Sequence, residues 1–331
     1  MTSTSPSSEV LRDIYTKMLL TRIVDDCAQG LYADGYIDFL SSCQGHEAAQ
    51  IGSAVCIEIG QDFTLPYYRD LGVVLTLGMT PYEIFRTYLQ AHHKPPTEQL
   101  IDPQQILQHW GYQKHNTITG PTPVGTQLLH AAGIAFASKL RKAAVVTIAY
   151  CGDDVTKDPD FVEGIQFATQ HQLPVVFICE QDNVTSCASD ASTTFFLSSC
   201  LEEHALPTDL TYQLVDSRNV IAVYAAMRQA MQHAREGHGP TLLEMAVARS
   251  HPHIPVSYTP IVTSAGVTQH MPLQSSVSSA GAIADPLVYC QHVLQERGIW
   301  DKEWASQLST RIMTEVKRAL QDALRDTLQS K

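Results

Sequence analysis

Two apolar runs in the middle of the chain constrain its fold more than any other feature. Residues 142–150 read KAAVVTIAY and residues 173–179 read LPVVFIC, with a helical pattern between them. Asp158 followed by Pro159 is typical of the N-cap and first turn of such a helix. Continuous apolar runs are typical of strands buried on both faces, and a strand–helix–strand unit joins parallel strands. The sequence therefore predicts an α/β fold with a doubly wound parallel sheet.

Helical patterns flank this unit on both sides. Apolar residues recur at helical spacing from a serine-rich start to Gly35, and Asp285, followed by proline, begins a C-terminal helix that Gly298 ends. Asp301 is expected to cap a last, amphipathic helix. Further helices are expected at residues 47–60, 81–91 and 219–236, and a further strand at 240–249.

These patterns divide the chain into segments of one continuous structural domain. The segment 254–284 contains no Asp, Glu, Lys or Arg and is rich in Ser, Pro and Thr, so it is interpreted as a loop. The expected order is an N-terminal helical segment that packs on the core (1–60), an α/β domain (61–253), the uncharged loop (254–284) and C-terminal helices (285–331).

Composition excludes several classes of function. The net charge of −12 argues against a nucleic-acid surface, which needs clustered Lys and Arg. No apolar run reaches the roughly 18–20 residues of a membrane span. The start MTSTSPSSEV has the features of neither a signal peptide nor a transit peptide. The eight cysteines form no CxxC pair, and several lie in apolar runs, which fits reduced, buried thiols. We therefore expect a cytoplasmic protein.

Carboxylates follow both central runs. Asp153 and Asp154 come after the first run, and Asp182 comes after the second. Ligands of open parallel sheets bind at the carboxyl ends of the strands, and these oxygens suit Mg²⁺, which usually arrives with a phosphate ligand. Two alternatives stay open at this point. The carboxylates could be turn formers and helix caps, or they could serve a Mg²⁺-dependent phosphohydrolase.

A series of motifs in fixed order carries a family resemblance. The motifs are CQGHEAAQIGSA, LPYYRDLGVVLTLGMTPYEIF, HWGYQKHNTITGPTPVGTQLLHAAGIAFASKLR, the block from Asp153 to Asn183, VIAVYAAMRQAM, GPTLLEMAVARSHPH and DPLVYCQHVLQERGIW. Over about residues 10–325 the chain resembles the alpha subunit of the thiamine-diphosphate-dependent first component of 2-oxo acid dehydrogenase complexes (pyruvate, branched-chain and acetoin types). The resemblance implies the thiamine-diphosphate-binding type of sheet, with helical N- and C-terminal extensions.

The resemblance also implies thiamine diphosphate and Mg²⁺ as cofactors and assigns residues to them. The implied metal ligands are Asp153, Asp182 and the main-chain carbonyl of Val184. The implied cofactor-binding residues are Tyr68, Arg69, Val124, Asp154, Val155 and Arg249, and the implied catalytic histidines are His253 on the substrate side and His109 in an active-site loop. Thr126 and Gln127 match positions that help to hold a structural K⁺ in some members.

The implied reaction is decarboxylation of a 2-oxo acid, followed by acyl transfer to lipoamide on a second protein. The resemblance also implies that the glutamate that activates the cofactor lies on a separate beta subunit. The chain is therefore expected to be inactive alone and to act in an α2β2 heterotetramer bound to a lipoyl acyltransferase core. Nucleic acid and membrane are not expected partners, and the sequence does not distinguish pyruvate from branched-chain 2-oxo acids.

The cofactor end departs from the family pattern toward negative charge. Asp154 stands where the family has a glycine, and Asp182 stands where it has an asparagine ligand. Two unit charges about 5 Å apart repel by roughly 3 kcal/mol at an effective dielectric near 20. The loop after His253 also lacks the family's acidic residues and arginine. These departures leave an alternative function, a noncatalytic homologue with an assembly or regulatory role that has lost the cofactor.

Overall fold

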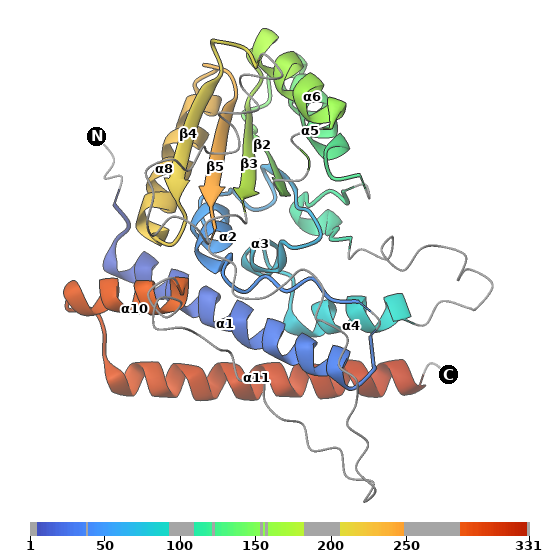
Figure 1. Ribbon diagram of the computed structural model, residues 1–331, viewed down its shortest axis with the longest axis vertical. Helices are drawn as coiled ribbons and strands as arrows, with labels where there is room; N and C mark the ends of the chain where they lie inside the picture. Colours follow the sequence, from blue (N-terminus) through green and yellow to red (C-terminus); the bar gives the residue numbers. More distant parts are fainter. Residues whose placement is uncertain are drawn as a thin grey trace, which may run out of the picture.

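A computed structural model describes residues 5–37, 39–92, 109–120, 123–152, 155, 158–181, 206–247 and 285–329. Its centre is a sheet of five parallel strands in the order β1-β2-β3-β5-β4 (Figure 1). The strands are β1 (Phe63–Leu65), β2 (Thr147–Gly152), β3 (Val175–Gln181), β4 (Thr211–Asp216) and β5 (Thr241–Ala246). The predicted α/β class and parallel sheet are confirmed.

Helices cover both faces of this sheet. On one face, α5 (Thr126–Leu140) and α6 (Pro159–Gln170) pack on alternate residues of β2 and β3, including Ala149, Cys151 and Phe177. On the other face, α2 (Glu47–Ala54) and α8 (Val220–Arg235) pack on the residues between, such as Ile148 and Ile178. Every residue of β3 is buried, which the apolar run 175–179 predicts and which also holds for Glu180 and Gln181 at its end.

A layer of helices lies against one end of the sheet. It contains α1 (Ser8–Ala33), α3 (Leu71–Thr76), α4 (Pro81–His92), α10 (Pro286–Glu296) and α11 (Lys302–Gln329). In Figure 1 α11 runs along α1, and the two helices pack on each other although they stand at opposite ends of the sequence. A short 3-10 helix, η3 (Gln113–His115), completes the regular elements of the described residues.

The start signals of the helices are confirmed. The side chains of Ser7, Asp158 and Asp285 each accept a hydrogen bond from a main-chain N–H in the first turn of α1, α6 and α10. Asp301 Oδ1 accepts from Trp304 N at the start of α11. Short polar side chains satisfy N–H groups that have no partner within the helix, so their positions could be predicted from sequence.

Some predicted boundaries are wrong. β2 begins at Thr147, because Lys142 has a left-handed conformation (φ 54°) that ends α5 and the alanines after it are exposed in the connection. The predicted helix at 47–60 ends at Ala54. β1 and β4 were not predicted, because β1 has only three residues and β4 is an edge strand with mostly exposed side chains.

The uncharged segment 254–284 lies outside the described residues. The six described cysteines are all free thiols. None of the described helices combines the length and the apolar character needed to cross a membrane.

Candidate active site

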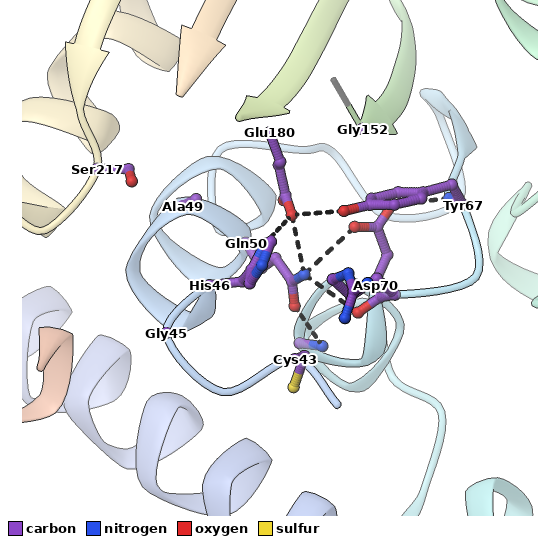
Figure 2. A network of polar contacts seen from close by, with 12 residues as sticks. Cys43, Gly45, His46, Ala49, Gln50, Tyr67, Asp70, Gly152, Glu180 and Ser217 are labelled. Atoms are coloured by element: carbon purple, nitrogen blue, oxygen red, sulfur yellow. Dashed lines mark hydrogen bonds and ion pairs between the residues drawn. The ribbon is translucent and has the colours of Figure 1, made fainter. Parts of the chain in front are cut away.

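The carboxyl ends of β2 and β3 lie side by side, with Gly152 opposite Glu180 in the parallel register. A group of buried polar side chains fills the space beneath them (Figure 2). We call it the polar cluster, and it consists of His46, Gln50, Tyr67, Asp70 and Glu180, which are between 0% and 4% exposed. They come from β3, from the start of α2 and from the turn between β1 and α3. The cluster therefore ties three elements together at the edge where ligands of parallel sheets bind.

Glu180 is the centre of the polar cluster. Its Oε2 atom lies 2.6 Å from His46 Nδ1 and accepts hydrogen bonds from the Tyr67 hydroxyl at 3.1 Å and the Gln50 amide at 3.2 Å. Its other oxygen, Oε1, is buried and has no hydrogen-bond partner among the described residues. Three donors on one oxygen hold the end of β3 firmly, because hydrogen bonds to a charged acceptor are the strong ones in a protein interior.

Asp70 is the second carboxyl group of the polar cluster. Its Oδ2 accepts from the main-chain N–H of Tyr67 at 2.8 Å, and its Oδ1 is 3.4 Å from the Gln50 amide nitrogen. Burial raises the pKa of the Asp70 carboxyl well above its ordinary value, and the nearby Glu180 carboxylate raises that pKa further. The Gln50 amide lies between the two acids and bridges them.

The turn from Tyr67 to Asp70 carries two predicted cofactor residues, Tyr68 and Arg69. Arg69 is 1% exposed, its guanidinium NH1 donates to the main-chain carbonyl of Ser42 at 2.6 Å, and it stacks over the Tyr68 ring at 5.6 Å. The Trp110 indole N–H donates to the Tyr68 carbonyl at 3.0 Å. A buried guanidinium with a fixed main chain is suited to an anion that arrives at this edge.

The other described site residues surround this edge. Val124 is half-buried and packs against the apolar residues on both faces of the sheet. Val155 is half-buried on the face covered by α5 and α6. His109 is exposed, and its Nδ1 lies 3.0 Å from the Gly120 carbonyl oxygen, which orients the ring.

Thr126 and Gln127 begin α5. The Thr126 hydroxyl donates to Asp160 Oδ2 at 2.6 Å, and the Gln127 amide nitrogen donates to the Tyr150 carbonyl. Gln127 Oε1 is buried without a hydrogen-bond partner among the described residues. An unpartnered buried oxygen of this kind is suited to a cation.

The remaining predicted site residues lie outside the described residues: Asp153, Asp154, Asp182, Val184, Arg249 and His253. Among the described residues no group of three or more His, Cys, Asp or Glu side chains is arranged to hold a metal. The strands that lead to the two predicted aspartate ligands are described, and they end side by side at Gly152 and Gln181.

Comparison with known proteins decides the family. The family model described as dehydrogenase E1 component matches residues 15–330, nearly the whole chain. The chain belongs to the dehydrogenase E1 component family. It is 33% identical over 308 residues to 2-oxoisovalerate dehydrogenase subunit alpha of Bacillus subtilis, covering 93% of this chain and 88% of that relative. It is 28% identical over 317 residues to pyruvate dehydrogenase E1 component subunit alpha of Staphylococcus aureus (strain Mu50), covering 95% of this chain and 78% of the relative. The predicted family, and with it the prediction of an oxidoreductase, is confirmed.

No pattern in the sequence of this E1 chain assigns a role to the polar cluster. Glu180 stands two positions before the predicted ligand Asp182, and its partners lie far from it in the chain. One signal was available. Glu180 is a charged residue in direct continuation of a buried apolar strand, and such a residue needs a buried partner. The motifs around His46 and Tyr67 were noted only as family landmarks.

Proposed function

We propose that this chain is the alpha subunit of a 2-oxo acid dehydrogenase that uses thiamine diphosphate and Mg²⁺ to decarboxylate a 2-oxo acid and transfers the acyl group to lipoamide. Thiamine-dependent decarboxylation is the activity of its family. The observation that carries the proposal is Arg69, a buried arginine whose main-chain carbonyl shares the Gln50 amide with Glu180 at the end of β3, the strand that leads to Asp182. A diphosphate with its cation needs both kinds of group.

The residues fit these cofactors chemically. Asp153, Asp182 and the carbonyl of Val184 offer the oxygen ligands that Mg²⁺ prefers. β2 and β3 are neighbours in register at Gly152 and Glu180, so the described ends of the two strands lie about one strand spacing apart, roughly 4.8 Å. A structural K⁺ beside Thr126 and Gln127 is part of the proposal, and the buried Gln127 Oε1 supports it.

Each side chain then has a defined task. When bound, thiamine diphosphate supplies the nucleophilic carbon that the reaction needs. Arg69 and Arg249 offset the charge of the diphosphate, and Val124 packs beside the cofactor's rings. His109 and His253 bind the substrate and move protons on its side of the site. Tyr68, Asp154 and Val155 complete the contacts with the cofactor.

The site requires a second chain. We propose an α2β2 heterotetramer in which the beta subunit contributes the activating glutamate, attached to a lipoyl acyltransferase core. The names of the relatives as alpha subunits support this assembly. We also propose a cytoplasmic location, which the free thiols of the described cysteines support.

Two alternatives are weaker. The comparisons give no support to a noncatalytic homologue, because the relatives named above are dehydrogenase subunits. A Mg²⁺-dependent phosphohydrolase would use the carboxylates, but it gives Arg249 and the SHPH sequence at 250–253 no role.

The proposed function is tested by reconstitution. The purified chain should not decarboxylate any 2-oxo acid by itself. With a beta subunit, thiamine diphosphate and Mg²⁺ it should release CO₂ from pyruvate or a branched-chain 2-oxo acid, measured with an artificial electron acceptor. Turnover by the isolated chain would refute the two-chain site. Failure of the complex to bind thiamine diphosphate would favour the noncatalytic homologue.

A separate prediction concerns Asp154. Asp154→Gly should tighten binding of thiamine diphosphate with Mg²⁺ about tenfold, because it removes a repulsion of roughly 1–3 kcal/mol after screening by solvent and cation. The measurement is calorimetric titration of the complex with the beta subunit. Asp154→Asn is the matched control, since it removes the charge but not the side chain. An unchanged dissociation constant in both variants would show that Asp154 does not face the diphosphate.

A further inference from the structure

The segment between α1 and α2 is irregular, yet it is buried. Residues 39–46 form no helix or strand, and every residue from Ser41 to His46 is buried. Irregular segments normally lie on the surface, because their main-chain polar groups need water or other partners. A buried one therefore keeps its shape only if specific side chains satisfy it.

Asp25 on α1 satisfies the first half of this segment. It is 0% exposed, and its Oδ2 accepts from the Ser42 hydroxyl at 2.7 Å and from the Gln29 amide at 2.9 Å. Its Oδ1 accepts from the main-chain N–H of Cys43 at 3.0 Å. The Ser42 hydroxyl also accepts from the main-chain N–H of Gln44 at 3.2 Å. One carboxylate thus fixes Ser42 and Cys43 directly, and Gln44 through the Ser42 hydroxyl.

The second half of the segment has its own anchor. Gly45 has a left-handed conformation (φ 97°) that favours glycine, and its N–H donates to Glu47 Oε2 at 2.8 Å. Arg22 of α1 holds the other oxygen of Glu47. Gln44 also contacts Asp26, which is exposed on α1. Both halves of the segment are therefore anchored to α1, the first by Asp25 and the second by Arg22 through Glu47.

The segment reaches the candidate active site through His46, which contacts Glu180, and through Ser42, which contacts Arg69. The main-chain carbonyl of Ser42 accepts a hydrogen bond of 2.6 Å from the guanidinium of Arg69. Ser42 therefore links Asp25 to Arg69. Its hydroxyl donates to the Asp25 carboxylate, and its main-chain carbonyl accepts from the Arg69 guanidinium. Figure 2 shows Cys43 and Gly45 of this segment next to the polar cluster.

We propose that Asp25 is a positioning residue for the cofactor: by fixing the Ser42 carbonyl it aims the Arg69 guanidinium at the diphosphate. This inference rests on the proposed function, in which Arg69 binds the diphosphate. Asp25 itself acts only through Ser42. A guanidinium on a long, flexible side chain binds an anion more tightly when its direction is fixed before the anion arrives.

The test is a double-mutant cycle in the complex with the beta subunit. The dissociation constant of thiamine diphosphate at saturating Mg²⁺ is measured by calorimetry for wild type, Asp25→Asn, Arg69→Ala and the double variant. Asparagine keeps the shape of Asp25 but offers one oxygen to three donors, so Asp25→Asn should weaken binding about tenfold. On the Arg69→Ala background it should add nothing, because the group it aims is absent. Asp13→Asn, an exposed aspartate on the same helix, is the control and should change nothing.

Each outcome decides the proposal. If Asp25→Asn weakens binding equally with and without Arg69, Asp25 is only structural. If Asp25→Asn does not weaken binding at all, Arg69 does not depend on Asp25. Either result overturns this inference and leaves the proposed function standing. If the wild-type complex does not bind thiamine diphosphate, or if Arg69→Ala binds it as tightly as wild type does, the proposed site and this inference are both overturned. If Asp25→Asn does not fold, Ser42→Ala takes its place in the cycle. It removes one donor and keeps the carbonyl, so about threefold weakening is expected, again only when Arg69 is present.

Discussion

Glu180→Leu is expected to lower the free energy of unfolding of the full chain by about 3–5 kcal/mol. The leucine fills a similar volume, but the donors on His46, Gln50 and Tyr67 lose the oxygen that they share. Each is buried, so no water replaces the lost acceptor. A loss of this size is a large part of the stability of a typical domain, about 5–15 kcal/mol. Urea unfolding followed by tryptophan fluorescence measures it.

Glu180→Gln is the matched variant for this prediction. Glutamine keeps one acceptor oxygen for the three donors, so its cost should be about 1–2 kcal/mol. Equal losses in the two variants would mean that the lost charge, and not the lost shared acceptor, accounts for the effect. A loss below about 1 kcal/mol in Glu180→Leu would show that the polar cluster contributes little to stability.

Arg69→Ala is expected to weaken binding of thiamine diphosphate to the complex about 30-fold or more. The physical reason is that truncating one partner of a buried, hydrogen-bonded charge contact costs about 2 kcal/mol or more, which is this factor in the dissociation constant. The 1% exposure of Arg69 means that solvent screens the contact only weakly. Calorimetric titration at saturating Mg²⁺ gives the value.

Arg86 provides the matched control for this measurement. It is an exposed arginine on α4 that stacks over the Tyr82 ring at 5.8 Å, as Arg69 stacks over Tyr68. Arg86→Ala removes the same groups far from the strand ends, so the dissociation constant should not change. A similar loss in both variants would point to net charge, and an unchanged constant in Arg69→Ala would refute its assignment to the diphosphate.

The sequence by itself determined those structural features that depend on residues close together in the chain. The apolar runs of β2 and β3, with a helix between them, indicated buried parallel strands. A strand that is covered on both faces has apolar residues at consecutive positions and not only at alternate ones. Asp158 and Asp285 predicted helix starts, because a cap bonds to N–H groups two or three residues away. The ordered motifs indicated the family, and the placement of Asp153 and Asp182 after two adjacent strands followed from the same logic.

What only the tertiary structure decided depends on residues far apart in the chain. His46 and Tyr67 reach Glu180 across 134 and 113 positions, and Asp25 reaches Arg69 through Ser42. Neither periodicity nor capping rules can pair residues that are so far apart. The positions of α2 and of the turn after β1 relative to β3 are set by the packing of the folded chain. The family resemblance predicts Arg69 as a residue for the cofactor, and this stays a prediction. The direction in which its guanidinium is held is a property of the folded chain, because the carbonyl that holds it belongs to a segment anchored on another helix.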